Sequence, residues 1–238
     1  MAPSTRQSPS PKNLILAGLR NEGSETLSPH LEDVVIALGQ VLFEPEDLPG
    51  YVYFPHGQTI ISVVRTFVDG SSVEVGLAGF EGLVSLGSVM GSGPHRDMGV
   101  VQASGRASRI DAAVLRAEFK VAGPIHDAIV RYADFFLLMA TQNVACNRLH
   151  AVQSRLAKWL LLHHDRIRLD TLSVTHEFLS NMLGTRRAGV TVALGDLTRD
   201  GAISHRRNQV TIRSRPLLEE VVCECYGAMK GDFDTRVA

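Results

Sequence analysis

The chain has 238 residues, of which 45% are hydrophobic and 21% are charged, and its formal net charge at pH 7 is −1. This length is enough for one or two domains with hydrophobic cores of their own. The sequence contains no apolar run long enough to span a bilayer, and its Pro/Ser-rich start lacks the apolar segment of a signal peptide. We therefore expect a cytoplasmic protein that begins with a disordered tail over residues 1–12.

The charge is distributed unevenly along the chain. Residues 1–150 carry 11 Lys and Arg against 15 Asp and Glu, whereas residues 151–238 carry 13 against 10. A basic C-terminal half suits a polyanionic partner such as nucleic acid, although an excess of three charges is modest.

Short β-prone runs separated by turn signals fill the first half of the chain. The predicted strands cover residues 41–44, 51–54, 60–67, 73–77, 99–103 and 107–110. Glycines such as Gly57 and Gly79 lie between them. Short strands at this density are typical of a small β-sandwich or barrel.

A stripe of mostly apolar residues follows Pro124 with alternating steps of four and three. Its members are Ile125, Ile129, Tyr132, Phe136, Met139, Asn143 and Cys146. This spacing is typical of a coiled coil and predicts a long helix over residues 123–150 that pairs with a second copy, with Asn143 favouring a two-stranded, in-register pair. The alternative is that the stripe packs only against the barrel of its own chain.

Residues 175–197 have the pattern of a helix-turn-helix. Thr175 is a natural N-cap, Phe178, Leu179 and Met182 recur at helical spacing, and Gly184 supplies a residue that turns with positive φ. A second helix is predicted over residues 186–198, with Thr185 available to cap it. Its inward positions are Val190, Ala193, Leu194 and Leu197, and its outward ones include Ala188, Thr191 and Val192.

A basic hairpin is predicted directly after the second helix. Two β-prone runs, residues 202–204 and 209–213, flank a polar tip that contains Arg206 and Arg207. A helix-turn-helix followed by such a hairpin is a winged helix, and the two arginines suit phosphate contact over a wing at residues 205–209. The alternative is a solvated turn.

These blocks resemble the C-terminal half of Crp/Fnr-type bacterial transcription regulators. The likeness runs over residues 147–227 through NRLHAVQSRLAKWLLLHHDRI, LSVTHEFLSNMLGTRRAGVTVALGDLTRDGAIS and LLEEVVCECYG, and it is greatest to the branch whose DNA-binding helix begins LGxRRxxV. VEVGLAGFEGLVSL and VVQASGRASRI resemble the sensor barrel of that family. The resemblance implies an α+β fold with a jelly-roll sensor at residues 13–122, a dimerisation helix at 123–150 and a winged helix-turn-helix at 151–238.

The resemblance implies a homodimeric regulator of double-stranded DNA, with RNA polymerase as a further partner. Phosphate contacts are expected from Thr175, His176, Arg186, Arg206 and Arg207. Arg187 is the best candidate for a bidentate contact with guanine, and Thr191 offers a hydroxyl and a methyl group for thymine.

The resemblance also implies a small-molecule site in the barrel, where relatives hold cyclic nucleotides with a Gly-Glu pair and an Arg-Ser or Arg-Thr pair. This chain offers Glu81-Gly82 and Arg96-Asp97. The glutamate precedes its glycine, and Asp97 places a carboxylate where the phosphate expects a hydroxyl, so the sequence argues against a cyclic nucleotide. Glu81, Gly82 and Arg96 remain the candidate pocket for an unidentified effector, although Arg96 could equally be a surface arginine. The alternative is an effector-independent DNA-binding or architectural protein whose barrel is only a scaffold.

The remaining reactive residues predict no catalytic or metal centre. Cys146, Cys223 and Cys225 lack the paired four-ligand spacing of structural zinc and the cysteine sets of iron–sulfur clusters, so free thiols and no cofactor are expected. A redox role for Cys223 and Cys225 stays open. The one dense acid–base cluster, His163-His164-Asp165, ends a helix, where basic groups ordinarily complement the dipole. We expect no enzyme activity.

Overall fold

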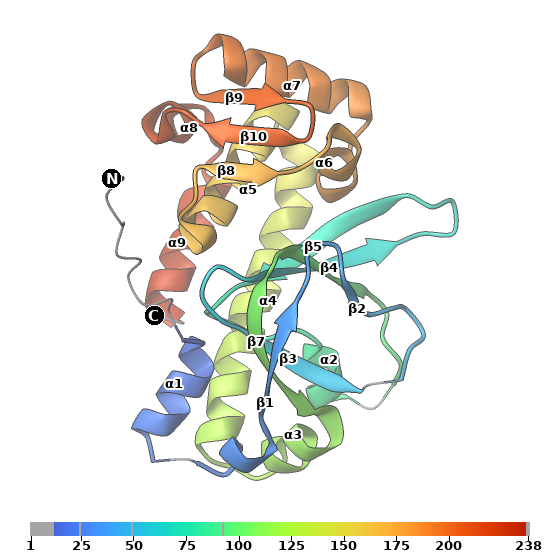
Figure 1. The fold of residues 1–238 in the computed structure, drawn as a ribbon, viewed down its shortest axis with the longest axis vertical. Helices are drawn as coiled ribbons and strands as arrows, with labels where there is room; N and C mark the ends of the chain where they lie inside the picture. The colour runs from blue at the N-terminus through green and yellow to red at the C-terminus, as the bar shows by residue number, and fades with distance from the viewer. Residues whose placement is uncertain (1–11, 24, 49, 92, 237–238) are drawn as a thin grey trace, which may run out of the picture.

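The computed structural model describes residues 12–23, 25–48, 50–91 and 93–236. The predicted tail, residues 1–12, lies outside the described residues except for Lys12. Figure 1 shows a β-barrel at one end of the molecule, a cluster of short helices and strands at the other, and one long helix that runs past both. Among the described helices, none is both long and apolar enough to cross a membrane.

Antiparallel strands build the barrel from two facing sheets. The strands are β1 (Glu32–Ile36), β2 (Val41–Phe43), β3 (Tyr51–Pro55), β4 (Ile60–Thr66), β5 (Ser72–Ala78), β6 (Met98–Ala103) and β7 (Gly105–Asp111). Their orders are β1-β7-β3 and β2-β6-β4-β5. Val52, Phe54 and Ile60 lie fully buried between the sheets. The six predicted β runs form β2 to β7, whereas β1 was not predicted because its residues are mostly exposed and begin with two acidic side chains.

Short helices close the ends of the barrel. They are α1 (Leu14–Asn21), the single turn η1 (Ser28–His30), α2 (Leu86–Met90) and α3 (Ala112–Phe119). Asn13 caps α1 by accepting a hydrogen bond from Leu16 N at 3.2 Å. The same buried amide donates to the carbonyls of Pro55 and Gly82, so it fixes the entry of the chain onto the barrel.

The long helix α4 (Pro124–Leu149) turns the predicted seam toward its own chain. Ile125, Ile129, Tyr132 and Met139 are buried in the main core. Phe136 covers Gly76 so closely that a Cβ there would lie 2.8 Å from its ring, and Asn143 donates to the carbonyl of Val75 at 3.2 Å. The assignment of these residues to a dimer seam was therefore wrong, and the alternative, packing against the barrel, is what the structure shows.

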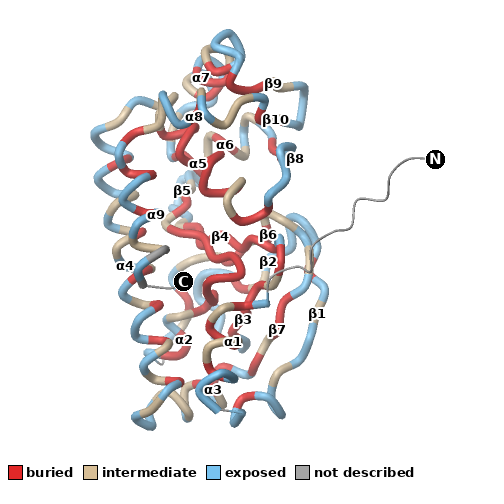
Figure 2. The backbone as a smooth tube through the Cα atoms, turned by 90° about the vertical axis from the view of Figure 1, so that its left-hand side faces the viewer, coloured by how far each residue is buried: buried red, intermediate tan, exposed pale blue. Residues whose placement is uncertain are grey.

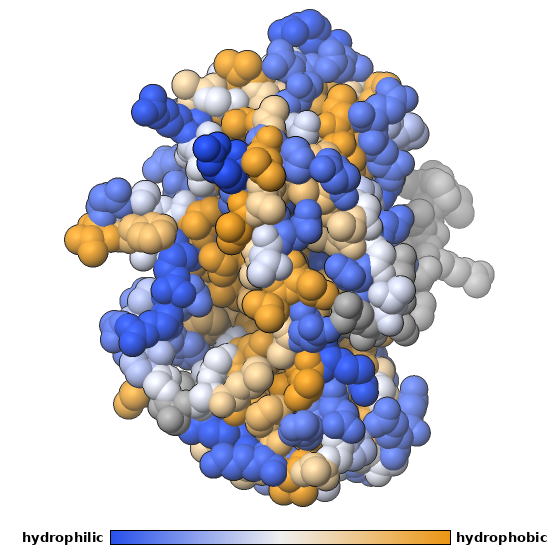
Figure 3. Space-filling model, turned by 180° about the vertical axis from the view of Figure 1, so that it is seen from behind, coloured by the Kyte–Doolittle hydropathy of each residue, from blue (hydrophilic) through white to orange (hydrophobic). Residues whose placement is uncertain are grey.

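A different row of α4 residues faces outward. Val130, Leu137 and Val144 are spaced by seven residues and remain 41%, 61% and 72% exposed. The alanines Ala133 and Ala140 lie between them on the same side, since both are three residues beyond a member of the row. We call these five residues the outer stripe. Figure 2 shows α4 at the edge of the molecule, buried on one side only, and Figure 3 shows hydrophobic surface running along the rear face.

The C-terminal part is a helical unit with a small sheet. Its elements are α5 (Val152–Ile167), β8 (Thr171–Ser173), α6 (His176–Met182), α7 (Arg187–Arg199), β9 (Ile203–Arg206), β10 (Gln209–Ile212), α8 (Arg215–Val221) and α9 (Cys225–Arg236). The strand order is β8-β10-β9. Helix α5 forms the centre, with Leu156, Leu160 and Leu161 completely buried.

Buried polar contacts join the barrel to this unit. Arg166 of α5 donates from Nε to Glu81 at 2.7 Å, and neither side chain is more than 7% exposed. Gln102 of β6 links Glu74 at 3.1 Å to His163 at 2.6 Å. Because buried charged and polar groups are costly without such partners, these contacts fix how the two parts meet.

Candidate nucleic-acid interface

The first helix of the predicted helix-turn-helix is α6, and its start follows from Thr175. The hydroxyl of Thr175 accepts a hydrogen bond from Phe178 N at 3.0 Å, which satisfies one of the amides left free at a helix N-terminus. Leu179 and Met182 are buried. Gly184 follows with φ +53°, as predicted for the turn. A Cβ on Gly184 would lie 3.0 Å from Val73 of the barrel, so the turn also packs tightly.

The second helix, α7, begins and ends one residue later than predicted. Arg186 holds the N-cap position without a side-chain cap, so Thr185 does not cap the helix. The predicted inward residues Val190, Ala193, Leu194 and Leu197 are all buried. Ala188, Thr191 and Val192 are exposed, as are Arg186 and Arg187 at the N-terminal end. The outward face of α7 is therefore open to a partner and is basic at its first turn.

Hydrogen bonds within the interface define what Thr191 and His176 can still do. The hydroxyl of Thr191 donates to the carbonyl of Arg187 at 3.1 Å, and His176 Nδ1 lies 3.1 Å from the same oxygen. Since that hydroxyl proton is already used, His176 Nδ1 is the donor, and its Nε2 remains free to accept. Partial burial lowers the pKa of His176, with further lowering by His205 and Arg187, so the ring is neutral at pH 7. Thr191 keeps its methyl group, and His176 its Nε2, for a partner.

The predicted wing is the hairpin of β9 and β10. Arg206 ends β9 and Arg207 lies at the tip with φ +41°, and both side chains are exposed. His205 anchors the hairpin to α7 because its Nδ1 lies 2.9 Å from Thr198 Oγ1. Its ring is also 5.8 Å from that of His176. Figure 1 shows α7 and the hairpin side by side at the same end of the molecule.

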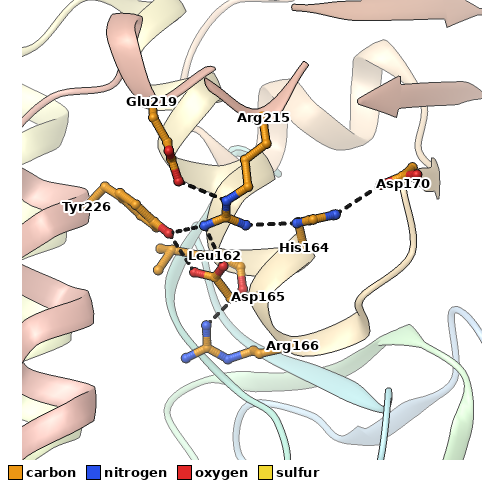
Figure 4. Close-up of polar contacts among 8 residues, drawn as sticks. All are labelled: Leu162, His164, Asp165, Arg166, Asp170, Arg215, Glu219 and Tyr226. Atoms are coloured by element: carbon orange, nitrogen blue, oxygen red, sulfur yellow. Dashed lines mark hydrogen bonds and ion pairs between the residues drawn. The ribbon is translucent and has the colours of Figure 1, made fainter. Parts of the chain in front are cut away.

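A polar network behind this surface involves residues that the sequence offered as an acid–base cluster. Arg215 donates to Asp165 and Glu219, each at 2.8 Å, and contacts His164 at 2.8 Å. Tyr226 donates to Asp165, and His164 also pairs with Asp170 (Figure 4). His163 points elsewhere, into the contact with Gln102. The three side chains thus diverge: His164 and Asp165 join α5 to α8 and α9, whereas His163 joins α5 to β6 of the barrel. Arg215 and Tyr226, which hold the network together, were not singled out from the sequence.

Sequence comparison identifies the domain that contains these helices. A family model described as the Crp-like helix-turn-helix domain matches residues 154–221. The chain carries a Crp-like helix-turn-helix domain. The Crp-like domain thus spans α5 to α8 and includes the exposed face of α7 and the hairpin. A DNA-binding domain of this kind agrees with the expectation that the protein is not an enzyme.

Solved structures extend the likeness from the Crp-like domain to the whole fold. A Crp/Fnr-family regulator from Eubacterium rectale is 16% identical with a TM-score of 0.69, over 85% of this chain and 96% of that one. A Crp-family regulator from Thermus thermophilus is 16% identical with a TM-score of 0.66, over 79% of this chain and 95% of that one. The c-di-GMP-responsive regulator CLP from Xanthomonas campestris is 18% identical with a TM-score of 0.63, over 82% of this chain and 99% of that one. No curated protein matches the sequence significantly. The architecture is therefore the predicted α+β fold of Crp/Fnr regulators.

The barrel contains a cavity of about 360 Å³ beside α4. It is lined by Phe43, Val63, Arg65, Leu83, Val84, Ser85, Leu86, Gly87, Ser88, Gly93, Pro94, His95, Arg96, Asp97 and Phe136. Arg65 pairs with Asp97 at 2.7 Å, so the two charges compensate each other. His95 stacks on Phe43, and burial lowers its pKa, which leaves it neutral at pH 7. The cavity therefore offers hydroxyls, rings and one internal ion pair instead of an unpaired cation.

The three predicted pocket residues do not form one site. Neither Glu81 nor Gly82 lines the cavity: Glu81 is fully buried against Arg166, and Gly82 lies under the Tyr132 ring with its carbonyl bonded to Asn13. Arg96 alone lines the cavity, and its side chain is 69% exposed beside Glu46. The grouping of Glu81 and Gly82 with Arg96 was wrong, because the chain turns between them and sends the glutamate into the contact with α5.

The three cysteines come together, although the sequence did not predict this. Cys146 near the end of α4 lies against Cys223 and Cys225, which flank the link between α8 and α9. Cys146 and Cys223 are 77 positions apart in the sequence, so no local spacing motif indicates that the three cysteines form a group.

Proposed function

We propose that the protein is a homodimeric, sequence-specific transcription regulator of double-stranded DNA that works in the cytoplasm. The sensor barrel would occupy residues 13–122, the dimerisation helix 123–150 and the DNA-binding domain 151–238. The observation that carries this proposal is the exposed face of α7, whose arginine-bearing N-terminal end adjoins a hairpin with two exposed arginines. A recognition helix of a winged helix enters the major groove in this way.

Contacts with DNA divide by their chemistry. Arg187 starts α7 and is exposed, so its planar guanidinium is suited to the O6 and N7 acceptors of one guanine. Arg186, Arg206 and Arg207 are suited to phosphates, which position the protein on the duplex. The hydroxyl oxygen of Thr175 accepts a hydrogen bond in the α6 cap but keeps its proton, so Thr175 is suited to donate to a phosphate. RNA polymerase is the expected protein partner of such a regulator.

The outer stripe supports a homodimer through α4. Val130, Leu137 and Val144 repeat every seven residues, and the small Ala133 and Ala140 between them allow two helices to approach closely. A twofold axis along α4 would place two copies of α7 on two half-sites related by the same axis.

The barrel cavity is suited to receive the signal. Phe136 lines it from α4, whose other side carries the outer stripe, so an occupant would touch the helix that joins the two copies. Both arginines of its described lining already have carboxylate partners, Arg65 with Asp97 and Arg96 with Glu46, which is consistent with the expectation against cyclic nucleotides. The second candidate function, an effector-independent DNA-binding protein, is favoured by the buried Glu81–Arg166 pair, which fixes barrel and Crp-like domain together without a ligand.

Selection from random double-stranded DNA tests the proposal. The wild type should select a palindromic consensus with two half-sites. Arg187→Ala should lose the base preference at one position in each half-site, and the two positions should be mirror-related. The lost discrimination between the right and the wrong base should be about 1–3 kcal/mol. Arg187→Lys should restore part of it, because an ammonium lacks the planar fork. Arg199→Ala, at the other end of α7, is the control and should keep the consensus. An unchanged consensus for Arg187→Ala would assign that arginine to phosphate, and no consensus for the wild type would refute sequence-specific binding.

Ligand screening separates the two candidate functions. A ligand at 100 times its dissociation constant stabilises the folded protein by about 2.7 kcal/mol, which thermal unfolding detects readily. Operator titrations with and without each stabilising compound then show whether the barrel controls DNA binding. If no stabilising compound alters the operator affinity, the scaffold function is the better description.

A further inference from the structure

Four potential metal ligands converge at the junction of α4, α8 and α9. Cys146 and His150 come from the end of α4, and Cys223 and Cys225 come from the link into α9. One ligand atom from each residue lies within 4.8 Å of all the others. The three thiols are buried, and the His150 side chain is 23% exposed, so the group is closed to bulk solvent on most sides.

Two separations within this group are close to those of a tetrahedral zinc site. Cys146 Sγ lies 3.6 Å from Cys223 Sγ, and Cys225 Sγ lies 3.4 Å from His150 Nδ1. With Zn–S bonds of about 2.3 Å and Zn–N bonds of about 2.0–2.1 Å, tetrahedral geometry separates two sulfurs by about 3.8 Å and a sulfur from a nitrogen by about 3.6 Å. Two ligand pairs therefore already have nearly these separations, and all four ligand atoms lie within 4.8 Å of one another.

Neighbouring groups supply the contacts that orient zinc ligands in proteins. His150 faces the cluster with Nδ1, while its Nε2 lies 3.4 Å from the carboxylate of Glu224. A histidine bonded to a carboxylate through its second nitrogen is the usual outer arrangement of such ligands. Gln142 of α4 donates to Cys225 Sγ at 3.0 Å. This set of contacts fixes which histidine nitrogen points inward.

The local charges also suit a zinc ion with three thiolates. Such a site has a net charge of −1, because three thiolates exceed the charge of one Zn²⁺. Arg155 and Lys158 of α5 are both only about 5% exposed, and both act electrostatically on Cys146. Two buried cations beside a site of net negative charge lower the cost of burying it.

We propose that Cys146, His150, Cys223 and Cys225 form a structural zinc site that fastens the start of α9 to the end of α4. Three sulfurs and one nitrogen are soft ligands that select zinc over the hard cations Ca²⁺ and Mg²⁺, and four protein ligands leave no open position for catalysis. The ligand atoms are too close together to surround a multi-iron cluster and fit a single ion. Binding replaces the three thiol protons by the metal and involves no oxidation or reduction.

Cobalt titration of the reduced, metal-free full-length protein tests this site directly. We expect one Co²⁺ per chain, with the thiolate charge-transfer and tetrahedral d–d absorption bands of a sulfur-rich site, and displacement of the cobalt by Zn²⁺. Cys225→Ser should remove most of the charge-transfer intensity. Glu224→Gln should keep the stoichiometry but weaken zinc affinity by about 10- to 100-fold. Glu220→Gln, an exposed carboxylate on α8, is the matched control and should change neither.

Thiol reactivity of the wild type provides a readout that does not depend on any variant folding. Zinc should protect all three thiols from a thiol reagent, and a chelator should expose them again. Absence of thiolate bands at stoichiometric Co²⁺ would overturn the proposal. The proposal would also be overturned if zinc did not protect the thiols and Cys146 and Cys223 instead oxidised to a disulfide that only a reductant reverses. Equal cobalt spectra of the wild type and Cys225→Ser would show that the metal binds elsewhere.

Discussion

Replacing Leu137 by alanine tests whether the outer stripe holds two copies of the protein together. Leu137 is 61% exposed at the centre of the stripe, so most of its apolar surface remains to be buried by a partner. Fully burying a leucine side chain contributes about 1.5–3 kcal/mol, and the exposed share of this one corresponds to about 1–2 kcal/mol. Because a twofold dimer contains the residue twice, Leu137→Ala should weaken dimerisation by about 2–4 kcal/mol, or about 30- to 700-fold in the dissociation constant.

Sedimentation equilibrium over a wide range of protein concentrations measures this change. Leu149→Ala is the matched control, because Leu149 is 74% exposed on the same helix but points about 120° away from Leu137. Its dimer should retain the affinity of the wild type. If Leu137→Ala dimerises like the wild type while Leu149→Ala does not, the outer stripe is not the interface. A wild type that stays monomeric at every concentration would refute the dimer itself.

The remaining predictions concern DNA, ligand and pH. Arg206→Ala with Arg207→Ala should weaken binding to specific and random DNA alike and reduce the salt slope by about 0.9 per lost phosphate contact, so an unchanged slope in filter-binding titrations would remove the wing from the interface. Cyclic AMP should not change operator affinity, because Asp97 and Arg65 already neutralise each other, and micromolar binding by calorimetry would contradict this. Burial raises the pKa of Glu74 to about 7, above its ordinary 4.5, so the folded chain holds a proton that the unfolded chain loses. The contribution of this carboxyl to stability should therefore fall by about 3 kcal/mol as pH rises from 4.5 to 7 and then level off, and urea titrations should show it as a change of that size in the stability difference between the wild type and Glu74→Gln.

Helical periodicity correctly predicted which side of α7 is buried and which is exposed. In α7 the large apolar residues lie on one side only, so the positions of Val190, Leu194 and Leu197 define which side is buried. Gly184 then marks the turn, since few other residues adopt its φ of +53° at low cost. Local sequence is sufficient here because each helix has a single apolar face.

Helix α4 shows where periodicity becomes ambiguous. It has two apolar faces, and both repeat with steps that suit a coiled coil. The larger side chains, Tyr132, Phe135 and Met139, fill the space against the barrel, while the outer stripe carries smaller ones. Residue spacing alone cannot tell which of the two faces packs against the barrel, because the barrel residues that contact α4 are distant from it in the sequence.

Long-range contacts account for the other differences between sequence and structure. Glu81 resembled part of an effector pocket, yet its partner is Arg166 of α5, which is 85 residues away in the sequence. The cysteine group likewise depends on the return of α9 along α4, which no spacing motif records. Pairings of this kind follow from the tertiary fold and not from neighbouring residues.

The close contact of Gly184 with Val73 limits how such regulators can be recombined. Engineers who build chimaeras commonly cut between modules, and the end of α4 is the obvious place here. A foreign barrel with a bulkier side chain in place of Val73 would press on the turn that sets the angle between α6 and α7, since even a Cβ on Gly184 would approach to 3.0 Å. A graft of this Crp-like domain therefore has to carry the facing barrel residues with it, and the true module is larger than residues 154–221.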